Sequence, residues 1–260
     1  MYYIDIDIDN DDSYDYRGVY FTRYRPLSTE SPSESIQPLN GYEIETTYWF
    51  KYEPIEWEVL DNNDGSFLIF SHLILDSQNY YPYERNEIFE HNGGEGYANE
   101  YALSDIRIWL NDNFYNTAFS SWQKELIETT TVENGGLMSR QGTYHETEPT
   151  EDKMFLLSYP EIMAYYETKE SRITSGTDYA KVQGLATSQN NELGGGGEHM
   201  WWLRTAYCFT SFNYFACIVS GGGLSIHDDI TEDNTGAIVP AFIYANHTGV
   251  RVACRISIGD

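Results

Sequence analysis

Two short segments in the C-terminal half combine aromatic and hydrogen-bonding side chains, a mixture that is typical of recognition surfaces. Residues 207–214 have the sequence Tyr-Cys-Phe-Thr-Ser-Phe-Asn-Tyr, and residues 225–229 have the sequence Ser-Ile-His-Asp-Asp. In turns between strands, such side chains would offer stacking area and adaptable hydrogen bonds to a protein or glycan ligand. The predicted ligand-binding residues are Tyr207, Asn213, Tyr214, His227, Asp228 and Asp229. The alternative is that the aromatic residues Phe209, Phe212 and Tyr214 fill the core of the fold.

Signals of catalysis are weaker. His227 beside Asp228 and Asp229 is a candidate acid–base cluster, but a solvated turn is the simpler interpretation. No carboxylate pair is distinguished by its spacing, and no Gly-x-Ser-x-Gly motif or other nucleophile arrangement is present in the sequence. We therefore predict a non-catalytic binding module without catalytic residues, with an enzyme as the alternative.

The acidic N-terminus has an incomplete metal-binding pattern. Aspartates alternate from Asp5 to Asp11 as in an EF-hand loop, but Tyr16 stands where that loop needs a bidentate Glu. We expect residues 1–15 to form a solvated acidic arm or an edge strand without metal ligands. A calcium-stabilised adhesive module is the alternative.

The cysteines and histidines are too scattered for a metal site. The sequence contains neither His-Glu-x-x-His nor Cys-x-x-Cys. Cys208, Cys217 and Cys254 are expected to be small buried apolar residues. No cofactor is predicted, and calcium is left open.

The charge of the chain restricts its partners. The 260 residues include 41 Asp and Glu against 15 Lys and Arg, a net charge of −26. Nucleic acids and anionic lipid surfaces would repel such a protein, and no apolar run approaches the roughly 20 residues that span a bilayer. The start of the chain resembles no export signal, which predicts a cytoplasmic protein as given, or a surface or secreted one as part of a longer chain. The oligomeric state is not predicted.

Alternating patterns predict a sheet that joins distant parts of the chain. Residues 55–59 alternate apolar and acidic side chains around Trp57, with Val59 expected on the same face as Trp57. The turn sequence of residues 61–65 and the apolar residues 66–70 complete a hairpin. Residues 250–258 alternate with Arg251 and Arg255 on one face. Since opposite charges stabilise neighbouring strands, the strand around Trp57 and the C-terminal strand are expected to share a sheet.

Cap residues and helical spacing predict three helices. Ser104 precedes an apolar face from residue 106 to residue 114, and Ser120 with Gln123 forms a capping box before residues 122–127. Ser158 and Glu161 form a second capping box. Trp122 is expected in the core. Further strands are predicted at residues 42–50, 154–157, 201–204, 214–220, 224–227 and 237–244.

A series of short motifs follows in a specific order. They are residues 48–60, 75–80, 104–111, 114–119, 155–158, 177–180, 201–204 (Trp-Trp-Leu-Arg) and 249–251 (Gly-Val-Arg). The series resembles an uncharacterised bacterial domain family, common in Firmicutes and often attached to surface or secreted proteins. Residues within or beside these motifs are expected to be structural: Trp57, Trp109, Trp201, Trp202, Arg204 and Arg251.

The resemblance implies a variant of the C-type-lectin fold. That fold is shared by the formylglycine-generating-enzyme and sulfatase-modifying group and by the variable proteins of retroelements. Copper-dependent oxidases of this group use a closely spaced cysteine pair, whereas Cys208 and Cys217 are nine residues apart, which argues against that activity. We expect an α+β fold with mixed antiparallel sheets, two to three short helices, long irregular loops and paired terminal strands. The expected domain comprises residues 16–260.

Overall fold

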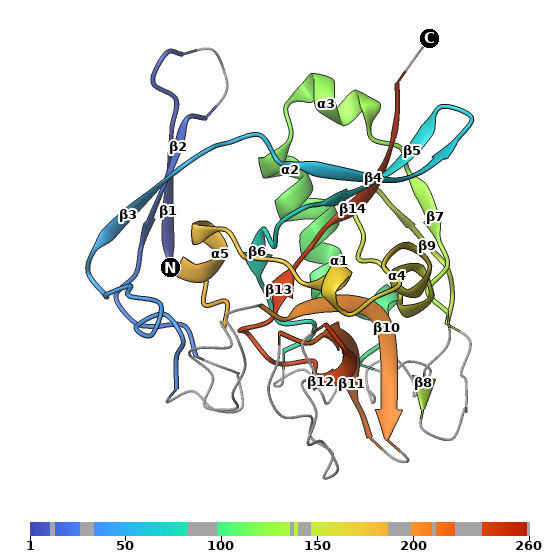
Figure 1. Cartoon of the computed structure of the whole chain (residues 1–260). Coiled ribbons are helices and arrows are strands. Elements are labelled where there is room, and N and C mark those ends of the chain that lie inside the picture. The colour runs from blue at the N-terminus through green and yellow to red at the C-terminus, as the bar shows by residue number, and fades with distance from the viewer. Residues whose placement is uncertain are drawn as a thin grey trace.

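The computed structural model describes residues 1–10, 14–26, 34–82, 98–135, 138–139, 147–186, 199–209, 212–221 and 236–258. These residues form an α+β protein with four β-sheets and short helices (Figure 1). Among them, no helix combines the length and apolar character needed to cross a lipid bilayer.

Three antiparallel strands form an N-terminal sheet at one side of the molecule (Figure 1). They are β1 (Tyr2–Ile6), β2 (Tyr16–Tyr20) and β3 (Thr47–Lys51), with β2 in the centre. One face carries Val19, which packs with Phe21 and with Val182 of α5 (Asp178–Val182) in a small hydrophobic cluster. Residues 2–6 are therefore an edge strand, one of the two predicted alternatives.

The predicted hairpin consists of β4 (Trp57–Asn63) and β5 (Ser66–Ser71). Asp64 and Gly65 have φ angles of 47° and 90°, the two positive values that a two-residue type I′ turn requires. The last strand, β14 (Ala253–Ser257), pairs with β5 on the side opposite β4. The prediction that the Trp57 strand and the C-terminal strand share a sheet is confirmed, with β5 between them.

The predicted opposite charges meet across this sheet, but one pairing differs. Arg251 Nη2 lies 3.4 Å from Glu58 Oε1, whereas Arg255 Nη2 lies 3.2 Å from Asp61 Oδ2. The register of β4 shifts between Val59 and Asp61, which changes the side-chain alternation. Trp57 and Val59 lie before this shift, in regular register with β5, and so share a face as predicted, although Val59 is 64% exposed.

A larger, six-stranded mixed sheet contributes to the main core of the molecule. Its strand order is β12 (Ile238–Phe242), β11 (Phe212–Val219), β10 (Trp201–Phe209), β13 (Gly249–Val250) and β6 (Asp76–Ser77), and β8 (Met138–Ser139) also pairs with β10. β13 and β8 run parallel to β10, and the other pairs are antiparallel.

The C-terminal run predicted as one strand is divided between two sheets. After β13 the chain leaves the large sheet at Arg251 and Val252, and β14 then joins the hairpin. The alternation predicted that Arg251 and Arg255 share one face of a single strand, but Arg251 lies before β14 and is only 2% exposed. The first and last strands, β1 and β14, belong to different sheets, which contradicts the predicted pairing of the terminal strands.

The predicted caps begin the predicted helices. The Ser104 side chain accepts a hydrogen bond from the Arg107 N–H at 3.3 Å and starts α1 (Asp105–Trp109). A π-helical turn (Leu110–Phe114) and α2 (Tyr115–Ala118) continue this helix, and we call residues 105–118 the long helix. Capping boxes begin α3 (Ser121–Leu126) and α4 (Tyr159–Tyr165). The prediction of Trp122 in the core is wrong, because it is 64% exposed on α3.

The remaining short elements complete the described chain. They are the 3₁₀ turns Tyr101–Leu103 and Glu170–Arg172, and the antiparallel strands β7 (Thr130–Val132) and β9 (Thr150–Asp152). Residues 154–157 are buried but make an isolated bridge, from Phe155 to Ala253, in place of the predicted strand. Because α1 and α2 belong to one continuous helix, the described residues form four separate helices that are not 3₁₀ turns, one more than the two to three predicted.

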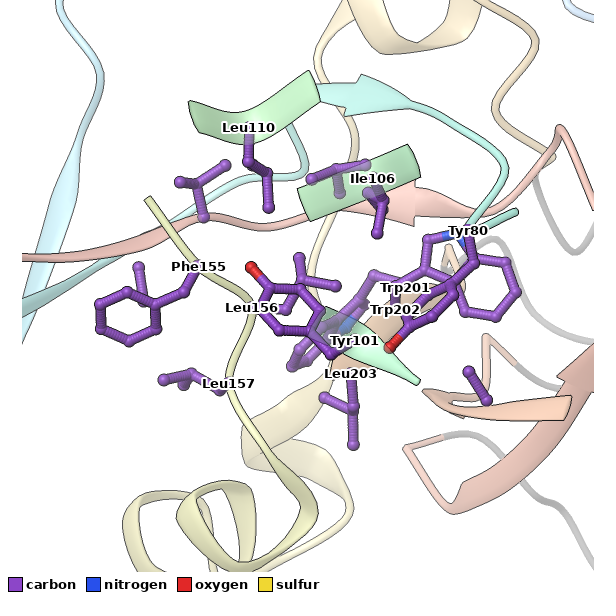
Figure 2. Packing of buried hydrophobic residues seen from close by; sticks show 14 of the residues in the cluster. Tyr80, Tyr101, Ile106, Leu110, Phe155, Leu156, Leu157, Trp201, Trp202 and Leu203 are labelled. Atoms are coloured by element: carbon purple, nitrogen blue, oxygen red, sulfur yellow. The ribbon is translucent and has the colours of Figure 1, made fainter. Parts of the chain in front are cut away.

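The main hydrophobic core lies between the helices and the large sheet. Figure 2 shows Trp201 and Trp202 of β10 beside Tyr80, below Ile106 and Leu110 of the long helix. Both tryptophans are fully buried, and their indole N–H groups donate to backbone carbonyls, Trp202 to Gln78 O at 2.7 Å. Cys217 and Cys254 are buried free thiols as predicted, and burial raises the pKa of each to about 12.

Candidate functional site

A polar pocket of about 200 Å³ lies between the N-terminal sheet, α5 and the long helix. Its lining side chains come from β1, β2, β6 and the residue after it, the long helix and α5. They are Tyr3, Arg17, Asp76, Gln78, Trp109, Asn113, Thr117 and Tyr179.

Arg17 is held rigidly at one wall of the pocket. Its guanidinium makes a two-pronged ion pair with Asp5, at 2.7 Å and 2.8 Å, and donates to the Tyr179 hydroxyl at 3.3 Å. The Tyr52 hydroxyl donates to the same Asp5 carboxylate at 2.9 Å. Burial alone would raise the pKa of Asp5, but the hydrogen bonds and charge of Arg17 outweigh it and lower that pKa. This pair stays charged and presents an oriented cation to the pocket.

Asp76 is a buried carboxylate in the lining of the pocket. It is 7% exposed, and its Oδ1 accepts hydrogen bonds from the Ser77 N–H at 2.6 Å and from Gln78 Nε2 at 3.3 Å. Burial raises the pKa of Asp76 to about 6, against the opposing effects of the Ser77 N–H and the Arg25 charge. At neutral pH this group is therefore an acceptor that changes its protonation state in a slightly acidic medium.

Arg25 is a buried cation that interacts electrostatically with Asp76. It donates to the backbone carbonyls of Ser77 at 2.5 Å and Gln183 at 3.0 Å. Burial lowers the pKa of Arg25, and the charge of Asp76 opposes that shift. The positive charge of Arg25 therefore partly offsets the cost of burying the negative charge of Asp76.

Two tyrosines add hydroxyl groups and ring faces. The Tyr3 hydroxyl donates to Gln183 Oε1 at 3.1 Å, and the Tyr179 hydroxyl accepts from Arg17. Burial, followed by the charge of Asp76, raises the pKa of both phenols. Both hydroxyls therefore stay protonated at neutral pH and act as hydrogen-bond donors and acceptors.

The long helix contributes three of the lining residues. Trp109, Asn113 and Thr117 follow one another at a spacing of four residues. In a regular α-helix this spacing turns by about 40° at each step, but the π-helical turn between Leu110 and Phe114 holds more residues per turn and reduces that drift. The π-helical turn thus helps three side chains reach one pocket, while Leu110 stays fully buried in the core.

The pocket is chemically suited to binding. Its lining combines a carboxylate, a guanidinium, two amides, three hydroxyls and an indole, and no Ser, Cys or His lines it among the residues that the structure describes. Such a mixture of donors and acceptors beside aromatic rings complements a ligand rich in hydroxyl groups.

The predicted ligand-binding residues lie elsewhere. Tyr207 lies within β10 and not in a turn, and its partly buried side chain packs against the main core. Asn213 and Tyr214 lie within β11, and their side chains are outside the described part of the structure. His227, Asp228 and Asp229 also fall outside the described residues. The ligand-binding role of these six residues stays a prediction.

The residues predicted to be structural have varied surroundings. Arg204 is 4% exposed and donates to Leu156 O at 2.7 Å and Glu133 O at 3.0 Å. Trp57 is partly buried against the main core. Trp109, by contrast, lines the pocket as well as packing against the core.

The acidic N-terminus does bring carboxylates together. Oxygen atoms of Asp7, Asp9 and Asp15 lie within 4.8 Å of one another. Asp7 accepts from the Asn10 N–H and Asp15 from the Ile8 N–H, each at 2.7 Å, so the turn itself uses part of this cluster. Calcium binding stays a prediction.

The pocket was not predicted from the sequence, although four of its residues lie in the motifs noted above. The motifs at 75–80, 104–111 and 177–180 contain Asp76, Gln78, Trp109 and Tyr179. These residue types alone did not distinguish pocket residues from core residues, because only the packing of the three segments brings them together.

Comparison with known proteins places the pocket in a family context. No curated protein and no solved structure matches the chain. A family model described as a domain of unknown function, DUF6273, matches residues 64–258. The match includes every pocket residue except Tyr3 and Arg17, which the N-terminal sheet adds. Because the match covers most of the sequence, the chain belongs to the DUF6273 family.

Proposed function

We propose that this protein is a non-catalytic recognition module that binds one unit of a glycan in the pocket between the N-terminal sheet and the DUF6273 domain. The observation that carries the proposal is the composition of the pocket. Asp76 supplies acceptors, Arg17 supplies donors, and Asn113 supplies both, beside the rings of Tyr3 and Trp109. A sugar presents hydroxyl groups at its edge and apolar C–H groups on its face, and this lining complements both.

The size of the pocket supports a small ligand unit. Sites for drug-sized molecules enclose roughly 300–1,000 Å³, whereas this pocket holds about 200 Å³. A single saccharide unit is of this scale, and the rest of a glycan would extend into solvent.

The DUF6273 region has a strand pairing that bears on its fold. We propose a C-type-lectin-like architecture for the DUF6273 region, supported by the direct pairing of β5 with β14, which lie near the two ends of the matched residues. The proposed setting is a bacterial surface, in keeping with the resemblance described above. A protein ligand is the alternative to a glycan.

Binding to an array of glycans and cell-wall fragments tests the function. We expect saturable binding that Asn113→Ala or Thr117→Ala weakens about tenfold, which is the effect of losing one hydrogen bond worth about 1.4 kcal/mol. Asn116→Ala is the matched control, because Asn116 is exposed on the same helix and bonds to Asp112 rather than lining the pocket.

Two outcomes would contradict the proposal. Equal weakening by Asn113→Ala and Asn116→Ala would show that the pocket is not the site. Turnover of a bound glycan would replace the recognition module with an enzyme.

A further inference from the structure

The outer face of the N-terminal sheet, turned away from α5, is rich in exposed aromatic and aliphatic side chains. Strand alternation places nine residues on it: Tyr2, Ile4, Ile6, Tyr16, Gly18, Tyr20, Thr47, Trp49 and Lys51. Tyr2 is 64% exposed, Ile4 57% and Trp49 49%. Lys51 is the one charged residue among the nine.

Gly18 makes this face flat. A Cβ atom at Gly18 would lie 2.9 Å from the six-membered ring of Trp49 and 2.8 Å from Ile4 Cγ2. The indole therefore lies over the glycine, close to the backbone of the sheet. Beside it the rings of Tyr2 and Tyr20 have their centres 6.2 Å apart. We call this surface, formed by Tyr2, Ile4, Gly18, Tyr20 and Trp49, the aromatic platform.

Carboxylates lie beyond both ends of the aromatic platform. At one end, just after β1 and before β2, the oxygens of Asp7, Asp9 and Asp15 converge within 4.8 Å. At the other end, just before β3, Glu43 and Glu45 are exposed, and the Glu45 N–H donates to Phe21 O at 2.7 Å, next to the end of β2. An apolar centre between two negative ends complements a partner with the opposite charges.

We propose that the aromatic platform docks a basic polypeptide segment of a partner protein. Lysine and arginine stems would lie along the rings of Tyr2, Tyr20 and Trp49, and their cationic heads would reach the carboxylates at the two ends. The net charge of −26 favours this partner over a second copy of the same chain or an anionic polymer, since both would be repelled.

This surface is separate from the glycan pocket. Tyr3 and Arg17, which line the pocket, alternate with Tyr2 and Gly18 and so lie on the opposite face of the same sheet. Loss of one binding activity therefore leaves the other measurable.

The experiment uses the full chain and a fluorescein-labelled peptide of alternating lysine and valine, with a glutamate–valine peptide for comparison. We expect the basic peptide to bind, the acidic one not to bind, and Trp49→Ala to weaken binding at least tenfold. Trp122→Ala is the matched control, because Trp122 is 64% exposed on α3, outside the platform. Thermal unfolding checks that each variant is folded.

A second variant keeps the test decisive if Trp49→Ala disturbs the sheet. Tyr2→Lys places a positive charge on an exposed edge of the platform and should weaken the basic peptide by repulsion, whereas Tyr165→Lys on α4 should not. Equal weakening by Trp49→Ala and Trp122→Ala would show that the peptide does not bind at the platform and would overturn the proposal. So would a neutral oligosaccharide that binds the platform in place of the peptide.

Discussion

Arg17 and Arg251 have similar partners but lie in different regions of the molecule. Arg17 lies with its guanidinium carbon 5.5 Å to 6.0 Å from the ring centres of Tyr3, Tyr52 and Tyr179, and pairs with Asp5. Arg251 lies 4.0 Å from the ring centre of Phe70 and 4.9 Å from that of Trp201, and pairs with Glu58.

The difference lies in the space that is left around each cation. Arg251 is 2% exposed, and it donates twice to Ser71 O, at 2.7 Å and 2.9 Å. The side chain of Arg17 is 18% exposed, and its rings are farther away. A cation among aromatic rings therefore connects two sheets where the packing is complete, and lines a pocket where the neighbouring elements leave space.

Replacing Arg251 should have the largest effect. Arg251→Met leaves Ser71 O and the Glu58–Tyr166 hydrogen bond without their cation, so we expect the free energy of unfolding to fall by about 4 kcal/mol. Urea denaturation followed by circular dichroism measures it. A loss below 1 kcal/mol would mean that the aromatic packing around this residue, and not the cation, stabilises the junction.

Asp76→Asn should change how the free energy of unfolding depends on pH, because it removes the titrating carboxylate from the pocket. The folded protein holds the Asp76 proton up to a pKa of about 6, whereas the unfolded chain releases it near 3.8, so wild-type stability falls as pH rises through this window. The variant lacks this loss. Its free energy of unfolding relative to wild type should therefore rise by about 2 kcal/mol between pH 4 and pH 7.

Denaturation of both proteins at several pH values provides the measurement. A difference that stays constant with pH would show that Asp76 is not shifted upward by burial. Glycan binding should weaken in the same variant at neutral pH, where wild-type Asp76 is ionised.

Arg17→Lys should separate binding from stability. Lysine keeps the charge but loses the two-pronged pairing with Asp5, so we expect a stability loss of only about 1 kcal/mol. Glycan affinity should fall about tenfold, because the oriented guanidinium at the pocket wall is lost. Calorimetric titration measures the affinity. Unchanged affinity would remove Arg17 from the binding site.

Arg255→Met should have the smallest effect. Its ion pair with Asp61 has side chains 21% and 34% exposed, and solvent screens such pairs, so a change below 1 kcal/mol is expected. This variant is also the control for Arg251→Met, since both remove a cation from the same C-terminal segment. Equal losses in the free energy of unfolding in the two variants would show that burial does not make the Arg251 contacts more stabilising than the exposed Arg255 pair.

Local features of the fold were predictable. Ser104, Ser120 and Ser158 begin helices because their side chains offer oxygen atoms to free backbone N–H groups, which needs no knowledge of the rest of the chain. The Asp64–Gly65 turn is local in the same sense. The charge patterns of residues 56–58 and 251–255 also identified a shared sheet, although β5 lies between the two strands.

The positions of individual side chains were less predictable. Trp122 has a large apolar side chain of the kind that usually lies in a core, but its position on α3 leaves it exposed. Arg251 was expected on the same strand face as Arg255 because alternation was assumed to continue through residues 250–258, whereas the chain changes sheets at that point. Tyr207, chosen as an exposed turn residue, is part of a strand and packs against the core.

The sequence by itself determined the helix starts, the hairpin, the acidic character and the family, because each depends on neighbouring residues or on the whole composition. Only the tertiary structure decided where the pocket lies. Arg17, Asp76 and Asn113 become neighbours of one cavity through the packing of a sheet, a strand and a helix. Such packing depends on the fit between distant surfaces, which no local pattern records.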